Sequence, residues 1–171
     1  MLRKKRLLYL TSSRLTAHSL SRSGLVVDAV FERNDQGLAA FSAYLAGSRN
    51  LYYLVVDVVE EDYHQDTIPY LGRTDRRKVL ARKLGQRYRD TSLTLSMSLG
   101  YEQSERRNEK VLYAAFSYTQ QFQPWLSALE QKECRLAGIY STALLAPAVI
   151  RGAGLKLPRC LLVSVQATGL R

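Results

Sequence analysis

The sequence predicts a mixed α/β fold, with a five-stranded sheet in which three antiparallel strands come first and the sheet then continues in parallel. Three short β patterns joined by polar turns occupy residues 6–33, and helix and strand patterns alternate along the rest of the chain. The chain has 171 residues, of which 46% are hydrophobic and 23% charged. This length suits one domain, and this composition excludes disorder as the main state.

The first part of the chain is read as three strands, a helix and a further strand. The first three strands are expected at residues 6–10, 15–20 and 25–33. Polar turns at Thr11–Ser13 and Ser23–Gly24 separate them. Asp35 is expected to cap a helix that ends at Gly47. Residues 51–59 are almost all apolar, which predicts a central strand buried on both faces.

The remaining elements follow from the same two periodicities. Thr74 or Asp75 is expected to cap a basic helix that buries a stripe formed by Leu80, Leu84 and Tyr88. Strands are expected at 92–101, 108–118, 135–140 and 161–165, and helices are expected at 119–133 and 141–150. Ser141 is the expected cap of the last helix.

Two segments and the element order resemble a known family. Residues 8–17 (LYLTSSRLTA) look like its opening hairpin, and residues 125–129 (WLSAL) with 137–141 (AGIYS) look like the helix and strand that close its first lobe. The family is the actin-like ATPase superfamily, whose lobes have a ribonuclease-H-like core. The specific resemblance is to pilus-assembly proteins of the PilM type and to the cytoplasmic part of the L protein of type II secretion.

The resemblance implies a domain organisation. Residues 1–171 would form a single actin-like lobe. Its core would consist of residues 1–59 and 119–171, and residues 60–118 would form an inserted αββ subdomain.

The resemblance also implies a nucleotide-binding hairpin, which departs from the family pattern here. In the family the first hairpin carries an Asp that organises magnesium and a Gly that lets the backbone approach phosphate. Tyr9 stands in the place of that Asp and Thr11 in the place of that Gly. A phenol does not replace a hard anionic ligand, and a Cβ hinders the close approach. Ser12 and Ser13 can donate to a phosphate, but turn chemistry explains them equally well.

The second phosphate hairpin of the family would begin near residue 161, where Ser164 and Gln166 take the places of its Asp and Gly. Both phosphate signatures are therefore degenerate, which predicts no catalytic residue, no metal and no cofactor. The alternative is that ATP with magnesium binds in a longer protein. Because the sequence ends at Arg171 within this hairpin, we expect it to be a fragment that a second lobe follows.

Other catalytic readings are weaker. Asp28 and Asp57 lie on predicted strands, but the first strand carries no carboxylate for a two-metal nuclease. His64 and Asp66 have a ligand-like spacing, although with one other histidine in the chain a surface acidic loop at this position is the preferred interpretation. Cys134 lacks a histidine near it in sequence and is read, like Cys160, as a buried reduced thiol.

The charge distribution points to a binding surface. The net charge is +10, and residues 71–89 hold eight basic residues and one acidic residue. In the family, the inserted subdomain contacts neighbouring subunits or partners, so the resemblance assigns this helix to protein interaction. The predicted partner-binding residues are Arg73, Arg76, Arg77, Lys83 and Arg87. The alternatives are a solvated helix face, nucleic-acid binding, which no motif supports, and attraction to an anionic membrane surface.

Together these inferences predict a non-catalytic actin-like scaffold lobe. It would mediate protein–protein interactions in a bacterial pilus-biogenesis or secretion-type envelope assembly, with a homo-oligomer as a further option. No apolar run is long enough to span a bilayer, so we expect a cytoplasmic protein, peripheral to the inner membrane or anchored there through a missing C-terminal part. The alternatives are an active nucleotide-binding ATPase completed by a second lobe, and a basic nucleic-acid-binding module.

Overall fold

The computed structural model describes residues 4–103, 106–154, 163, 165–166 and 169–170. The chain divides into two compact units, one made of residues 1–59 and 121–171 and the other of residues 60–120. Within the described part of the chain, no helix is long and apolar enough to cross a membrane.

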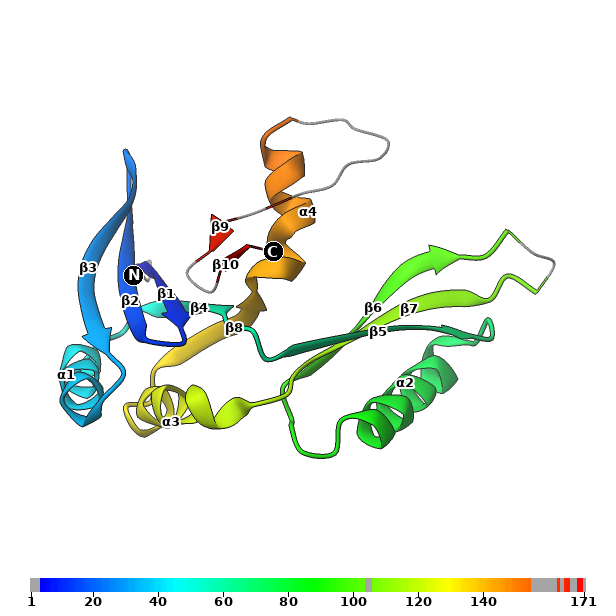
Figure 1. Cartoon of the computed structure of the whole chain (residues 1–171), viewed down its shortest axis with the longest axis horizontal. Coiled ribbons are helices and arrows are strands. Elements are labelled where there is room, and N and C mark those ends of the chain that lie inside the picture. The colour runs from blue at the N-terminus through cyan, green and yellow to red at the C-terminus, as the bar shows by residue number, and fades with distance from the viewer. Residues whose placement is uncertain (1–3, 104–105, 155–162, 164, 167–168, 171) are drawn as a thin grey trace. The chain divides into compact units, whose positions relative to one another are not determined.

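The first unit contains a five-stranded mixed sheet with the strand order β3-β2-β1-β4-β8 (Figure 1). Its strands are β1 (Lys5–Thr11), β2 (Arg14–Ser21), β3 (Gly24–Glu32), β4 (Leu51–Asp57) and β8 (Arg135–Ser141). The pairs β1–β2 and β2–β3 are antiparallel, whereas β1–β4 and β4–β8 are parallel. The predicted five-stranded mixed sheet with three leading antiparallel strands is therefore confirmed.

Two helices of the first unit pack against each other and supply its aromatic core. They are α1 (Asp35–Leu45) and α3 (Gln123–Gln131), and the short 3-10 helix η1 (Thr119–Gln121) precedes α3. Phe41 of α1 meets Phe31 of β3 and Trp125 of α3 edge to face, with ring centroids 5.2 and 5.3 Å apart. Asn34 caps α1 by accepting from the Gly37 N–H, so the prediction of Asp35 as the cap was one residue late.

The two faces of β4 differ in burial, which corrects the predicted burial on both faces. Tyr52, Leu54 and Val56 are fully buried, whereas Leu51, Tyr53 and Val55 are only half-buried. The helix α4 (Thr142–Gly152) follows β8 and is capped by Ser141, as the sequence predicted. Because α4 buries none of its residues, it gives β4 and β8 only a partial cover.

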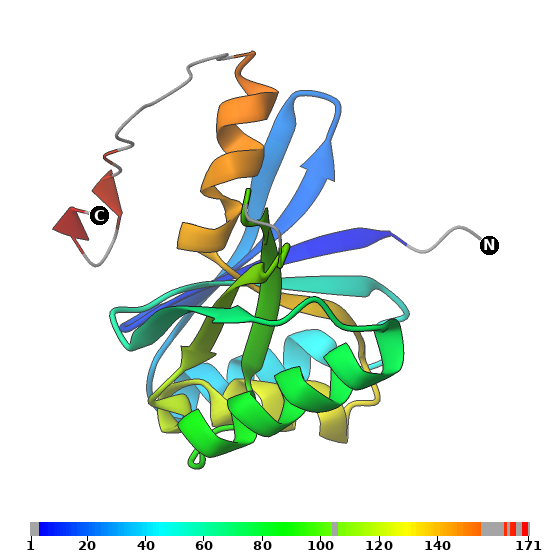
Figure 2. The same ribbon diagram turned by 90° about the vertical axis from the view of Figure 1, so that its right-hand side faces the viewer.

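The second unit is a three-stranded antiparallel sheet with one helix on it (Figure 2). The elements are β5 (Glu61–Ile68), α2 (Arg73–Arg87), β6 (Thr94–Tyr101) and β7 (Glu109–Phe116), and the strand order is β5-β7-β6. Its core joins α2 to the sheet and consists of Ile68, Leu80, Tyr88, Val111, Tyr113 and Ala115.

Two predictions for this unit need correction. Residues 61–68 form the strand β5 where an acidic surface stretch was expected, so the unit has the order βαββ and not αββ. Two carboxylates of β5, Asp62 and Asp66, pair with Arg87 and Lys83 of α2, which compensates part of the charge on this strand. Gly72 precedes α2 without a side-chain cap, so neither Thr74 nor Asp75 has the predicted capping role.

The C-terminal prediction is tested only in part. Two short strands, β9 (Val165–Gln166) and β10 (Gly169–Leu170), pair antiparallel with each other. Most of the strand expected at 161–165 lies outside the described residues, as do Cys160 and Ser164.

Candidate functional site

The turn between β1 and β2 uses its own hydroxyl groups to hold its shape. Thr11 is buried, and its Oγ1 donates to the Arg14 carbonyl at 3.1 Å while it accepts from the Arg14 N–H at 3.2 Å. The Arg33 guanidinium donates to the Ser12 carbonyl, and the Arg33 N–H donates to the Ser13 carbonyl. Ser12 and Ser13 are themselves exposed. The polar groups of Thr11 are therefore directed into the turn, as turn chemistry requires.

Tyr9 is joined to a buried carboxylate on the neighbouring strand. Its hydroxyl donates to Asp57 Oδ2 at 2.6 Å, and Asp57 is fully buried. The parallel register places Thr11 opposite Asp57 and Tyr9 opposite Val55. Asp57 thus lies at the end of β4 and reaches back across the pair to the phenol.

The carboxyl ends of the parallel strands are the usual ligand-binding edge of an α/β sheet. Here Thr11, Asp57 and Ser141 end β1, β4 and β8, and they are the three buried polar residues of this unit among those described. Ser141 is used as the cap of α4, Thr11 by the turn, and Asp57 by Tyr9. The Tyr9 hydroxyl thus engages one oxygen of Asp57, the buried acidic side chain at this edge among the described residues.

The basic helix α2 has a sheet-facing group of charges that the structure ties to its own sheet. Arg76 makes a two-pronged contact with Glu109 of β7, from Nε to Oε2 at 2.6 Å and from Nη2 to Oε1 at 2.7 Å. Glu109 is buried, with 2% of its surface exposed. The hydrogen bonds from Arg76 lower the pKa of Glu109 and, reciprocally, the contact raises the pKa of Arg76.

Two weaker ion pairs continue this row along α2. Lys83 Nζ lies 2.5 Å from Asp66 Oδ2, and its hydrogen bond lowers the pKa of the Asp66 carboxyl. Arg87 lies 3.8 Å from Asp62, and its guanidinium also covers the ring of Tyr88. The side chains of both pairs are about one-third exposed or more, so each pair contributes little to stability beside the pair of Arg76 with Glu109.

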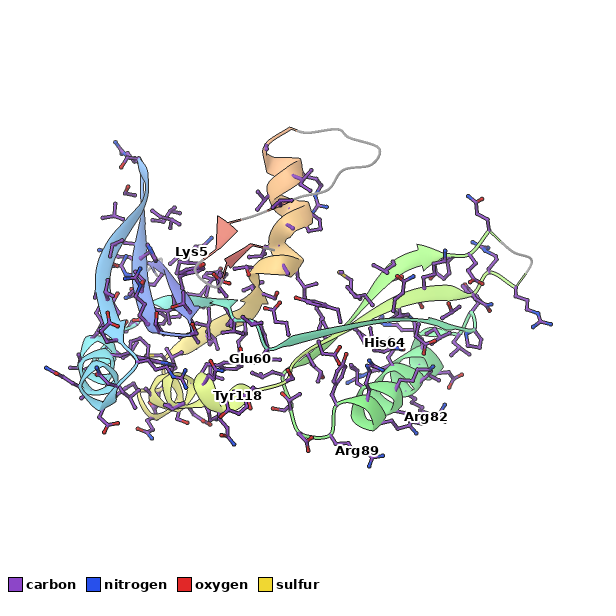
Figure 3. All side chains as sticks on the ribbon, viewed as in Figure 1. Lys5, Glu60, His64, Arg82, Arg89 and Tyr118 are labelled. Carbon is purple, nitrogen blue, oxygen red and sulfur yellow. The ribbon has the colours of Figure 1, made fainter. Side chains whose placement is uncertain are left out.

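The other basic residues of α2 face solvent. Arg73, Arg77, Lys78 and Arg82 are exposed, and none of them forms an ion pair within the described residues. In Figure 3, Arg82 of the helix and Arg89 of the loop that follows it extend on the side away from the sheet. The five predicted partner-binding residues therefore divide into Arg73 and Arg77, which are available, and Arg76, Lys83 and Arg87, which hold α2 on its sheet.

A depression of about 510 Å³ lies between α2 and β6. Arg73, Arg76 and Arg77 line it together with Ser96 of β6, and apolar residues of α2 form the rest, namely Leu80, Ala81 and Leu84. Since Arg76 is neutralised by Glu109, the uncompensated charge at this depression comes from Arg73 and Arg77. Sequence reasoning did not find the depression, because Ser96 carries no signal by itself.

The remaining candidates have structural roles. His64 and Asp66 lie on the strand β5 and not on a loop, and the described residues contain no group of three or more potential metal-binding side chains. Asp28 accepts from Ser19 and pairs with Arg6 at 3.4 Å. Cys134 is half-buried, and burial raises the pKa of its thiol, which does not favour a nucleophile.

Comparisons with known proteins give a fold but no sequence family. No family model matches the chain, and no curated protein matches it in sequence. A solved structure of the PilM-PilN type IV pilus biogenesis complex matches with a TM-score of 0.57 and 16% identity, over 88% of this chain and 52% of that one. This likeness confirms the predicted actin-like fold and, at 16% identity, shows the fold alone.

Two further solved structures match more distantly. The cytoplasmic domain of EpsL, an inner membrane component of the type II secretion system of Vibrio cholerae, gives a TM-score of 0.45 at 10% identity, over 81% of this chain and 57% of that one. A protein of unknown function with an actin-like ATPase fold from Bacteroides thetaiotaomicron gives 0.42 at 12% identity, over 87% and 56%. The chain spans a little over half the length of each structure that it matches.

Proposed function

We propose that this chain is a non-catalytic actin-like lobe that acts as a scaffold for protein–protein contacts in a pilus-biogenesis or secretion-type envelope assembly. The observation that carries the proposal is the hydrogen bond of 2.6 Å from Tyr9 to the buried Asp57. It engages one oxygen of the buried acidic group at the ligand-binding edge of the sheet, where a nucleotide-binding relative needs a carboxylate directed at the magnesium shell.

The assembly context is supported by the fold. A solved structure that matches 88% of this chain comes from a complex whose name pairs two pilus-biogenesis proteins. A scaffold in such a complex needs binding surfaces and not a reaction centre. The exposed basic residues of α2 supply such a surface, and we place the protein at the cytoplasmic side of the inner membrane.

Calorimetry tests the absence of nucleotide chemistry. We expect no heat of binding when the full chain is titrated with ATP and magnesium to 1 mM, and no phosphate release on incubation. A variant with Tyr9→Asp and Thr11→Gly, which restores the family pattern at both places, is the matched comparison. Micromolar magnesium-dependent binding by the unaltered chain, with hydrolysis, would contradict the scaffold and favour the nucleotide-binding alternative.

In-cell cross-linking tests the partner class. A photoreactive amino acid at Arg82, an exposed position on α2, is expected to cross-link to a component of the pilus or secretion machinery identified by mass spectrometry. The same group at Asp35, on α1, is the positional control. Cross-links to nucleic acid alone, together with retention on duplex DNA that falls steeply with salt, would instead support the nucleic-acid-binding reading.

A further inference from the structure

The two edges of the sheet in the second unit are differently protected. The edge strand β5 carries Glu61, Asp62, His64 and Asp66, and charges of this kind block pairing with another chain. The opposite edge strand, β6, has eight residues with no charge and no proline. Such an edge is a template for an additional strand.

The backbone of β6 presents its free hydrogen-bonding groups beside the depression. The Leu93 carbonyl accepts from the Phe116 N–H at 3.1 Å, so Leu93 and, two residues on, Leu95 direct their backbone groups toward β7. The intervening residues Thr94 and Ser96 therefore direct theirs to the open side, where the Thr94 N–H already donates to the Ser92 carbonyl at 3.0 Å. Ser96 also lines the depression below α2, so the available backbone and the arginines share one place.

Side chains on the two faces of β6 have different character. Facing α2, Ser96 lies beside Arg73 and Arg77, whose charges have no acidic partner among the described residues. On the opposite face, Leu95 and Met97 are exposed by 47% and 38%, and Leu99 by 46%. A strand added to this edge would meet positive charge on one face and apolar surface on the other.

We propose that the edge of β6 binds an extended segment of a partner protein in which acidic and apolar residues alternate. The partner residue opposite Ser96 would lie on the same side of the sheet as Ser96, because directly paired residues of neighbouring strands share a face. Acidic residues at this position and two positions away would direct their carboxylates at Arg73 and Arg77. Residues opposite Leu95 and Met97 would extend the apolar row. This inference rests on the proposed scaffold function and names the chemistry of the partner.

Peptide binding to the full chain tests the proposal. The probe is a fluorescein-labelled peptide, Thr-Val-Glu-Val-Asp-Val-Thr, measured by fluorescence anisotropy, and the comparison peptide replaces its two acidic residues by lysine. We expect the acidic peptide to bind and the lysine peptide to bind at least about tenfold more weakly, since close like charges replace attractive ones. Equal affinity for the two peptides would overturn the proposal.

Two pairs of charge reversals on one helix locate the site. Arg73→Glu with Arg77→Glu changes the depression, whereas Lys78→Glu with Arg82→Glu makes the same change of charge on α2 away from it. The first pair is expected to weaken acidic-peptide binding about tenfold and the second less than threefold, because exposed charges further away are screened. Equal losses would show general attraction to a basic protein and reject the site.

Ser96→Pro tests strand addition as such. Proline at this position removes one outward N–H, and edge strands tolerate such a substitution. We expect it to abolish peptide binding. Chemical shifts of the variant outside residues 93–99 check the fold, and in the unaltered chain the peptide should slow amide exchange at Ser96. Binding without protection at Ser96, or preferred binding of a single-stranded oligonucleotide of similar charge, would exclude an added strand. If these peptide tests fail but the cross-links from Arg82 to envelope components are still found, this inference is refuted and the proposed scaffold function is not.

Discussion

Among the described residues, each unit buries one carboxylate, and the two are satisfied in different ways. In the first unit Asp57 accepts from a neutral phenol, whereas in the second unit Glu109 is held by the two prongs of a guanidinium. In both units the sequence pattern assigns the donor a functional role, Tyr9 as the replacement of a magnesium-organising Asp and Arg76 as a partner-binding residue. The comparison teaches that a residue placed for stability can look like a displaced catalytic group or a binding group until its partner is known.

The largest expected effect comes from removing the guanidinium. Arg76→Met should cost about 3 kcal/mol of the free energy of unfolding of the second unit, because it leaves Glu109 buried and unpaired. Hydrogen exchange of the β7 backbone measures it, since the one tryptophan, Trp125, reports on the first unit. Arg77→Met, with an exposed side chain on the same helix, should change exchange by less than about 0.5 kcal/mol. Equal effects of the two substitutions would contradict the claim that the buried pair of Arg76 with Glu109 stabilises the second unit more than the exposed Arg77 does.

Removing the phenol hydroxyl should have a smaller effect in the first unit. Tyr9→Phe leaves Asp57 with one hydrogen bond fewer and is expected to cost about 1–2 kcal/mol. Urea unfolding followed by Trp125 fluorescence measures it. Tyr53→Phe on β4 is the control, since the Tyr53 hydroxyl has no hydrogen bond to any described residue. A loss at Tyr53 as large as that at Tyr9 would mean that the bond to Asp57 contributes nothing specific.

Acid should weaken the pair between Arg76 and Glu109. Arg76 lowers the pKa of folded Glu109, so the pair stabilises the second unit fully above the pKa of a glutamate in the unfolded chain, about 4.3, and this stability is lost as pH falls through the folded pKa. The protection of the β7 amides, corrected for the pH dependence of exchange in an unfolded chain, should therefore fall below about pH 4. Glu109→Gln should flatten this dependence, and a slope unchanged by that substitution would show that another group titrates.

The smallest effect is expected at the exposed end of the same row. Lys83→Met removes the ion pair with Asp66, whose members are both about one-third exposed, and should cost about 0.5 kcal/mol or less. The same exchange measurement on β7 applies, with 0.5 M salt as a second condition. A cost that matched Arg76→Met would mean that the row acts as one network and not as one buried pair with weak neighbours.

The fold was predictable where burial leaves a regular pattern. The three leading strands and the capped α4 follow from alternation and from Ser141, which are local signals. The strand β5 was missed because Asp62 and Asp66 are charged residues on its α2-facing side, and their basic partners on α2 become visible only in three dimensions. Burial on both faces of β4 failed because α4 covers less than an apolar strand suggests.

For the candidate sites, the sequence predicts which residues take part but not the contacts that they make. The sequence shows that Tyr9 replaces a carboxylate, but the bond to Asp57 depends on the register between β1 and β4. For α2 a signal was present and not used: Arg76, Lys83 and Arg87 are spaced on the same side of the helix as the buried Leu80. Basic residues on this side of the helix can have an internal acidic partner, whereas Lys78 and Arg82 lie on the opposite side.

The base of the second unit closes on itself. The N–H and the hydroxyl of Ser117 both donate to the Glu60 carbonyl, at 2.9 and 3.1 Å, so the incoming and outgoing chains meet where β5 begins and β7 ends. A gene rearrangement that replaced residues 61–116 by a short turn would leave the two flanking ends where they already are. One evolutionary step of this kind can therefore add, remove or exchange the second unit and, on the proposal above, the partner preference with it.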